Sequence, residues 1–450
     1  DSQLIEENPG MTISFSMLKK MREAYTTGGG RPVPVTVDTL IDIYHDKAEL
    51  FQYVECKLAE EQQIGCQLKK DHETVEILGR EARERLANLT PAEESRLLSL
   101  PRHLLRFTSS ATDARMVKRG AESLEKEKKH HSAVNWQKFL LSQTLFTHLL
   151  CDVIGQLFER LALNLNFHCK QPLDAIDELR RGLNHALVPR KNALALADRL
   201  GKLDKENERR KEDILVEAAS IVVEGNLCRQ LADDSRKNRF LLPTEGGDKE
   251  ASVEEVALDY YLKRDEAEFI SGVHSEGRLW HLLLHLFFQD LLFDRESPAL
   301  PDVWLCELQS YPLDLNCCTF YERRTSAVDS LLAGLGVSSV EQRIATVTRA
   351  WQKASDTEGL SLSQVAMFVR ACPVEVLKNV FEILLKNHRH RRSGFPDLVL
   401  WNKHTIAVSE VKGPGDSLSW KQRLWLDFFS RNGILAEVCL VRGVNRRRLS

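Results

Sequence analysis

The sequence lacks the patterns that mark several large classes of protein. Its ten cysteines include no Cys-x-x-Cys pair, which argues against a zinc ribbon or disulfide scaffold and favours reduced thiols in a cytosolic or nuclear protein. We expect no membrane span, because no apolar run approaches ~18 residues, and no signal peptide. The nucleophile elbow of α/β-hydrolases, the P-loop and the glycine-rich dinucleotide-binding turn are also absent.

An excess of charge of one sign is missing as well. The chain has 62 Lys and Arg against 65 Asp and Glu, for a net charge of −3. A nucleic-acid partner would therefore have to be met by local basic surface and not by the whole molecule. The 43% apolar and 28% charged content of the 450 residues is typical of a globular protein with roughly two to four domains.

The most informative segment covers residues 394–412, where a Pro-Asp pair precedes one apolar stretch and a second stretch ends in Glu-x-Lys. Both stretches predict strands. Glu410 and Lys412 are two residues apart, so their side chains share one strand face. If a hairpin forms around residues 402–404, Asp397 reaches that face. Two carboxylates can hold a hard cation such as Mg²⁺, and the lysine can orient water or neutralise phosphate charge, which predicts a metal-dependent phosphodiesterase.

Other residues near this pattern allow both structural and functional interpretations. Glu276 precedes an apolar helix, where it either complements the helix dipole or supplies a third carboxylate ligand. The basic run 388–392 is either a solvated turn or a phosphate-contacting patch. Gln422, on a helix predicted after the Glu-x-Lys strand, either faces the metal site or is exposed. His274 is interpreted as a packing residue, because no zinc-binding His-Glu-x-x-His motif contains it.

The apolar periodicity predicts a mainly helical chain that ends in an α/β unit. Helical spacing dominates the first half, including a helix over residues 214–231. Pairs of helices there suggest a solenoid like tetratricopeptide (TPR) repeats, with an irregular bundle as the alternative. A small mixed sheet flanked by helices is expected near the C-terminus. The strand patterns are at residues 398–401, 406–411 and 436–441.

Several segments together resemble one known family. Residues 394–441 closely resemble the VRR-NUC nuclease module and, more particularly, the Fanconi-associated nuclease family. Residues 273–277 (Val-His-Ser-Glu-Gly) resemble that family's Val/Ile-His-Gly-Glu-Gly segment, with serine at position 275 where the family often has glycine. Residues 311–315 resemble its Phe-Pro-Leu-Asp-Leu, and residues 160–165 resemble part of its helical repeats. The resemblance runs in the family's order from about residue 32 to the end.

This resemblance implies a fold and an activity. The fold would be mainly α, with a helical TPR-like region packed on a C-terminal α/β domain of the restriction-endonuclease-like PD-(D/E)xK type. The activity would be metal-dependent cleavage of 5′-flap and branched DNA, with 5′-to-3′ exonuclease action, in interstrand crosslink repair. The metal ligands for Mg²⁺ or Mn²⁺ carry over onto Glu276, Asp397, Glu410 and the carbonyl of Val411, and Lys412 carries over as the catalytic lysine.

The same resemblance implies how the chain divides and what it binds. The expected parts are a partial N-terminal segment (1–36), a helical TPR-like region (37–235), a helical part that supports the nuclease (236–386) and the VRR-NUC core (387–450). The family's pocket for a DNA 5′ phosphate carries over to Arg190 and Lys191. The candidate DNA contacts are therefore Arg190, Lys191, Arg391, Arg392 and Gln422.

We expect a nuclear protein whose partners are branched DNA with a 5′ phosphate and crosslink-repair proteins that bind a region N-terminal to this chain. Two other classes of function stay open from the residues. The chain could be a catalytically idle DNA-junction binder or repair scaffold, or a helical-repeat adaptor whose sheet only packs. The intact Asp397, Glu410 and Lys412 argue against an idle module, which could lose these costly clustered charges.

Overall fold

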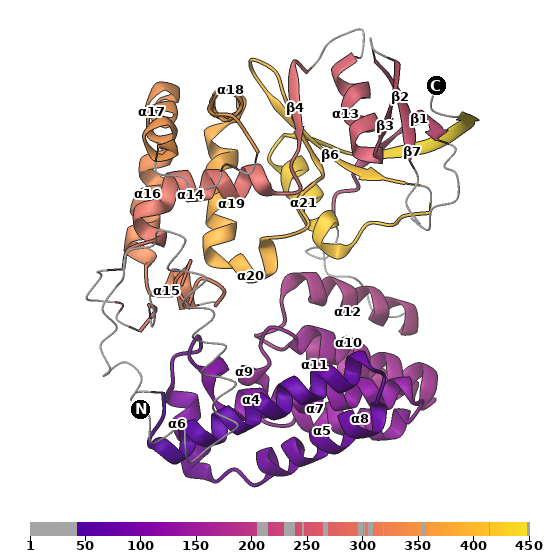
Figure 1. The fold of residues 1–450 in the computed structure, drawn as a ribbon, viewed down its shortest axis with the longest axis vertical. Helices are drawn as coiled ribbons and strands as arrows, with labels where there is room; N and C mark the ends of the chain where they lie inside the picture. The colour runs from indigo at the N-terminus through magenta and orange to yellow at the C-terminus, as the bar shows by residue number, and fades with distance from the viewer. Residues whose placement is uncertain are drawn as a thin grey trace.

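The computed structural model describes residues 43–447, apart from 205–214, 229–238, 245–246, 264–268, 296–299, 301, 305–308, 318, 353–356, 358 and 414. The expected N-terminal segment, residues 1–36, lies outside the described residues. A helical region fills the lower part of Figure 1, and a mixed sheet with its own helices fills the upper part. This confirms the expected fold class. Among the described helices, none is long and apolar enough to cross a membrane.

The helical region is a stack of antiparallel helices around one apolar core. Its α-helices are α4 (Lys47–Leu68), α5 (His72–Ala87), α6 (Pro91–Ser99), α7 (Ser109–Lys126), α8 (His130–Leu140), α9 (Thr144–Leu149), α10 (Ile154–Leu163), α11 (Pro172–Leu183) and α12 (Arg190–Leu203). A 3₁₀ turn, η1 (Leu105–Phe107), precedes α7, and a π-helical turn, η2 (Asn164–His168), follows α10. Side-chain caps fix several starts; Thr90 and Glu93, for example, form a capping box at α6.

Helices α5 and α7 approach each other closely because glycines face the indole of Trp136 at their contact. A Cβ added at Gly79 would lie 2.9 Å from that ring, and one added at Gly120 would overlap it. We expect Gly120→Ala to lower the free energy of unfolding by about 1–3 kcal/mol through overpacking. Denaturant unfolding measures this. Gly65→Ala in α4, where a Cβ meets nothing within 4 Å, is the matched control and is expected to be neutral or slightly stabilising.

The sheet has seven strands in the order β3-β2-β1-β7-β6-β5-β4. β7 pairs in parallel with both β1 and β6, and the other neighbours are antiparallel. The strands are β1 (Ala219–Cys228), β2 (Phe240–Thr244), β3 (Gly247–Ala251), β4 (Ser271–His274), β5 (Leu398–Trp401), β6 (Ile406–Lys412) and β7 (Leu435–Arg447). Helix α13 (Val253–Lys263) packs on one face. Helix α21 (Trp420–Arg431) packs on the other.

The helix predicted over residues 214–231 is wrong. Residues 219–228 form β1, which lies beside β7 with Val223 paired to Val441. The segment contains three consecutive β-branched residues, which fit a pleated surface better than a helix. The helix prediction was based on the apolar content of this segment alone. The sheet is therefore larger than the three strand patterns predicted, and its strands come from two distant parts of the sequence.

A set of helices between these strands extends the core beyond the sheet. They are α14 (Arg278–Leu292), α15 (Thr319–Glu322), α16 (Thr325–Gly336), α17 (Val340–Trp351), α18 (Leu362–Ala371), α19 (Val374–Lys386) and α20 (His388–Arg391). The fully buried Trp280 of α14 joins α18 to α21, the helix that packs on the sheet, since its ring centroid lies 5.2 Å from that of Phe368 and 5.4 Å from that of Phe429. In Figure 1 this group lies to the left of the sheet, with α20 directed toward the helical region.

Candidate active site

The predicted hairpin is confirmed and brings the acidic residues together. β5 and β6 pair with Leu398 opposite Ser409, so Asp397 comes opposite Glu410 at the end of the hairpin. The Asp397 Oδ2 atom accepts the backbone N–H of Val411 at 2.8 Å. Glu410 and Lys412 share a strand face as expected, with Lys412 Nζ 2.8 Å from Glu410 Oε1.

Glu410 is almost completely buried, at 1% exposed. Its Oε1 accepts hydrogen bonds from the Lys412 ammonium and the Gln422 side-chain amide. Its Oε2 has no hydrogen-bond partner within the described part of the chain. Burial, together with the neighbouring charge of Asp397, raises the pKa of Glu410 to about 8. Burial also raises the pKa of Asp397.

Gln422 is held in position by the start of α21. Its backbone N–H and side-chain oxygen form a capping box with Ser419, where the Ser419 N–H donates to Gln422 Oε1 at 2.9 Å. This leaves the amide nitrogen to donate to Glu410. Of the two interpretations of Gln422, the one in which it faces the acidic cluster matches the structure, and it does not line the basic pocket described below.

Glu276 reaches the cluster from β4 through a strained turn. The backbone N–H groups of Ser275 and Glu276 donate to the Asp397 carbonyl at 2.8 and 3.3 Å, which continues the β4–β5 pairing. Glu276 has φ +46° and Gly277 has φ +95°, a left-handed conformation that residues other than glycine rarely adopt. Helix α14 begins only after this turn, at Arg278. The turn therefore directs the Glu276 carboxylate toward Asp397 before the helix starts.

His274 belongs to this cluster, although its sequence context had suggested packing. Its side chain is 32% exposed, and its Nε2 lies 3.1 Å from Glu276 Oε1. Ligand atoms of His274, Glu276 and Asp397 all lie within 4.8 Å of one another. Its signal in the sequence was weak, because β4 ends at His274 and the approach of His274 to Asp397 depends on the pairing of β4 with β5.

The donor set fits a hard divalent cation. Carboxylate oxygens are the preferred ligands of Mg²⁺ and Mn²⁺, and one imidazole is compatible with Mn²⁺. The partnerless Glu410 Oε2 would gain a ligand-to-metal bond, which would offset the cost of burying a carboxylate. The ligand roles of Glu276, Asp397, Glu410 and the Val411 carbonyl stay predictions, and so does the catalytic role of Lys412.

A small basic pocket of about 50 Å³ lies where the helical region meets the sheet domain. Arg190 and Lys191 come from the start of α12, Arg391 from α20 and Lys421 from α21. The ammonium of Lys421 donates a hydrogen bond to Ser393 Oγ at 2.7 Å. Three of the predicted DNA contacts, Arg190, Lys191 and Arg391, are therefore brought together.

Arg392 does not line this pocket; its carbonyl instead accepts a hydrogen bond from His281 at 2.7 Å, in the tautomer with Nε2 protonated. His390 and Lys421 do line the pocket, and sequence reasoning did not single them out. Their signal was weak, because Lys421 lies 230 residues beyond Lys191 in the sequence and only the docking of α12 near α21 unites them.

Burial and crowding of like charges shift the titration of this pocket in one direction. Burial, followed by the charge of Lys191, lowers the pKa of His390 to about 4. Burial also lowers the pKa of Lys191, with Lys421 as the next cause, and that of Arg391, with Arg190 next. Cations whose protonated forms are disfavoured in this way would be stabilised by a bound anion.

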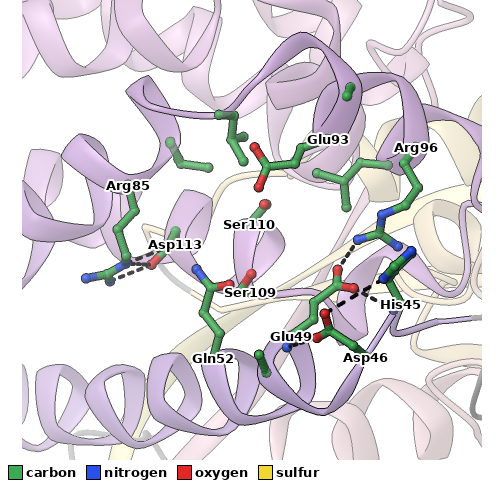
Figure 2. A pocket seen from close by; sticks show the side chains of 15 residues that line it. His45, Asp46, Glu49, Gln52, Arg85, Glu93, Arg96, Ser109, Ser110 and Asp113 are labelled. Atoms are coloured by element: carbon green, nitrogen blue, oxygen red, sulfur yellow. Dashed lines mark hydrogen bonds and ion pairs between the residues drawn. The ribbon is translucent and has the colours of Figure 1, made fainter.

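A larger cavity of about 430 Å³ lies in the helical region, between α4, α5, α6 and α7. Figure 2 shows that both of its arginines pair with carboxylates of the lining. Arg85 donates to Asp113 through Nη2 at 2.6 Å, and Arg96 pairs with Glu49. Its size alone does not make it a candidate active site, because its two arginines are already paired with carboxylates.

Comparison with known proteins gives two family matches. Residues 338–443 match the model of the VRR-NUC domain, and residues 53–204 match that of the Fanconi-associated nuclease 1 TPR domain. The chain is 32% identical to Fanconi-associated nuclease 1 homolog of Caenorhabditis briggsae, covering 100% of this chain and 54% of that protein. It is 30% identical to Fanconi-associated nuclease 1 of Homo sapiens, covering 78% of this chain and 36% of that one. The chain thus spans about half the length, or less, of these relatives.

A similar fold occurs in the crystal structure of paFAN1 bound to 2nt 5′flap DNA with gap. The TM-score is 0.58 at 19% identity, and the match covers 82% of this chain and 61% of that one. At this identity the likeness shows a shared fold.

Proposed function

Because this chain belongs to the Fanconi-associated nuclease family, we propose that it is a structure-specific DNA nuclease that cuts 5′-flap and other branched DNA. The proposal includes 5′-to-3′ exonuclease action and a nuclear role in interstrand crosslink repair, with crosslink-repair proteins as partners. One observation carries it: the half-buried Asp397 and Lys412 and the buried Glu410 form a cluster near the exposed Glu276 carboxylate. The 5′-flap DNA bound to paFAN1 supports a branched substrate.

The cluster would hold Mg²⁺ or Mn²⁺, which when bound supplies Lewis-acid activation of the phosphate and of the attacking water. Each carboxylate is oriented by its own neighbour. The Val411 N–H fixes Asp397, the Gln422 amide fixes Glu410, and the strained turn fixes Glu276. The proposed ligands are Glu276, Asp397, Glu410, the Val411 carbonyl and His274.

Lys412 is the proposed catalytic lysine. Its side chain is 12% exposed and its ammonium is held 2.8 Å from Glu410 Oε1, so it needs little reorganisation to reach a phosphate. From there it would orient the attacking water and stabilise the charge that develops on the phosphate oxygens. The lysine would act as a fixed cation. Its contact with Glu410 would hold the ammonium in place in the free protein and in the transition state.

The first experiment is cleavage of a labelled 5′-flap duplex with Mg²⁺ or Mn²⁺, beside the same reaction in EDTA. We expect cuts near the flap junction that require the metal. Tight flap binding without cuts in any divalent metal would contradict the nuclease proposal and support a junction-binding scaffold. Equal affinity for flap and blunt duplex, without cuts, would support a helical adaptor.

The basic pocket is the proposed site for the 5′ phosphate of the DNA. Arg190 and Lys191 from the helical region face Arg391 and Lys421 from the nuclease domain, and four cations around one small cavity match a phosphate dianion. The lowered pKa values in the pocket support an anionic occupant.

Lys421→Ala is expected to lower kcat/KM on a 5′-phosphorylated flap about 10-fold or more, because a charge-assisted hydrogen bond contributes about 1.5–3 kcal/mol. On a 5′-hydroxyl flap the loss should be about threefold or less, which corresponds to about 0.6 kcal/mol of residual electrostatic effect. Lys263→Ala, which removes a 60% exposed lysine from α13, is the control. Equal losses of Lys421→Ala on both substrates would argue against a phosphate in this pocket.

A further inference from the structure

A groove of about 720 Å³ opens beside the candidate active site, and it shares no lining residue with the basic pocket. Lys412 lines one end of it, and Trp420 and Arg423 of α21 line it as well. The groove is therefore continuous with the cluster that holds Glu410, since Lys412 contacts both. Nothing in the proposed hydrolysis uses Trp420 or Arg423.

The first turn of α21 serves three sites with three consecutive residues. Trp420 lines the groove, Lys421 lines the basic pocket and Gln422 donates to Glu410. Successive side chains on a helix are about 100° apart, so one turn can direct three neighbours to three surroundings. A DNA strand that places a phosphate at Lys412 would therefore pass next to Trp420.

The lining suits a flat, neutral group more than a phosphate. Its apolar members include Leu418, Val438 and Leu440. Its charges do not favour an anion, because Asp198, Glu217 and Asp416 oppose Lys412 and Arg423. Asp198 is paired with Lys202 at 2.7 Å, and Asp416 accepts the Gly413 N–H at 3.1 Å. The basic pocket has no such acidic residues among its lining residues, so the two sites differ in chemistry.

Trp420 offers a stacking surface in this groove. The guanidinium of Arg423 lies 5.3 Å from the centroid of its ring, one helical turn away, which orients the half-buried indole. Proteins bind unpaired bases by stacking them on aromatic side chains next to positively charged groups, because every base has a π-face.

We propose that the groove is a nucleobase subsite, in which Trp420 stacks on an unpaired base next to the phosphate that is cut. That the stacked base belongs to the strand that is cut rests on the proposed nuclease function. The stacking of a base on Trp420 does not depend on that function. The subsite makes the enzyme favour a scissile phosphate whose neighbouring base can leave the duplex stack. Acidic residues at the rim can accept hydrogen bonds from exocyclic amino groups of that base.

The test combines a change in the protein with a change in the DNA. Flaps that carry an abasic residue next to the cleavage position are compared with intact flaps, for the wild type, Trp420→Ala and Trp420→Phe. Stacking on one base contributes about 1–3 kcal/mol, so the abasic substitution and Trp420→Ala should each lower kcat/KM about tenfold. Combined, they should lower it little further, since both remove the same contact. Trp420→Phe should retain most of the activity and the sensitivity to the abasic residue.

Trp304→Ala is the matched control, because Trp304 forms a similar pair with Arg295, at 4.4 Å from the ring centroid, and does not line this groove. It should leave the effect of the abasic residue unchanged. Additive losses in the combined experiment, or a Trp420→Ala enzyme that cuts intact flaps at the wild-type rate, would overturn the subsite.

A binding readout separates this proposal from the nuclease proposal. A flap with 2-aminopurine at the same position is bound in EDTA, so no cleavage is needed. Quenching of its fluorescence by the wild type and Trp420→Phe, but not by Trp420→Ala, supports stacking even if no metal yields cuts. Cleavage without any difference in quenching between wild type and Trp420→Ala would support the nuclease and overturn the subsite.

Discussion

Asp397→Ala is expected to lower the rate of flap cleavage at saturating Mg²⁺ by about 1000-fold or more. The reason is that Asp397→Ala removes the carboxylate that accepts from the Val411 N–H and lies within 4.8 Å of the ligand atoms of His274 and Glu276, while the backbone pairing with Ser275 is kept. Loss of this ligand removes several kcal/mol of transition-state stabilisation, and each 1.4 kcal/mol is about a factor of ten in rate. Single-turnover cleavage of the labelled flap measures the effect.

Asp290→Asn is the control for this change, because it alters an exposed aspartate on α14. Its rate should stay within about twofold of the wild type, as expected for an exposed surface substitution. Flap affinity in EDTA, measured by fluorescence anisotropy, should be unchanged or slightly higher for Asp397→Ala, because a negative charge near the DNA is lost. Cleavage by Asp397→Ala at the wild-type rate would show that the metal site lies elsewhere.

The second large effect concerns pH in the absence of metal. Glu410 has its pKa raised from about 4.5 to about 8 by burial and by Asp397. A raised pKa means that the contribution of Glu410 to stability is fully present below the unfolded value and is lost as pH rises through about 8. Since one pKa unit corresponds to about 1.4 kcal/mol, the metal-free protein should lose about 2 kcal/mol of stability between pH 6.5 and 8.5.

Metal binding should reverse this trend, because the cation binds the ionised carboxylates and releases a proton. We expect Mn²⁺ to raise the Tm more at pH 8.5 than at pH 6.5, and its affinity to rise up to about tenfold per pH unit below pH 8. Glu410→Gln should flatten the pH dependence of the metal-free Tm and abolish both the effect of Mn²⁺ and cleavage. A metal-free Tm with the same pH dependence in wild type and Glu410→Gln would contradict the assigned ionisation.

The sequence was sufficient for those parts of the site that are local in the chain. The Asp397–Glu410–Lys412 hairpin follows from the two-residue period of a strand and a short turn, and both are visible within twenty residues. β1 was missed because its three β-branched residues have no local partner, and only the parallel pairing with β7 makes them a strand. His274 was missed for a similar reason, since its proximity to Asp397 depends on the pairing of β4 with β5.

The basic pocket shows the same limit more strongly. Arg190 and Lys191 were identified through the family resemblance, and Arg391 through the basic run. Lys421 had no signal of its own, because an isolated lysine on a helix is usually solvated. Its position depends on how α12 packs near α21, a contact between two domains that no local pattern encodes.

The capping box of α21 has a mechanical consequence. Lys421 and Gln422 are neighbours, so their Cα atoms are about 3.8 Å apart, and one faces the basic pocket while the other holds Glu410. The first turn of α21 thus connects Lys421, which would hold the 5′ phosphate, to Gln422, which orients Glu410 at the proposed cleavage site. The helix would therefore fix the distance between the 5′ phosphate and the cleavage site, whatever the base sequence of the DNA between these two points. Removal of the Ser419 cap should therefore spread the cleavage over more positions before it lowers the cleavage rate.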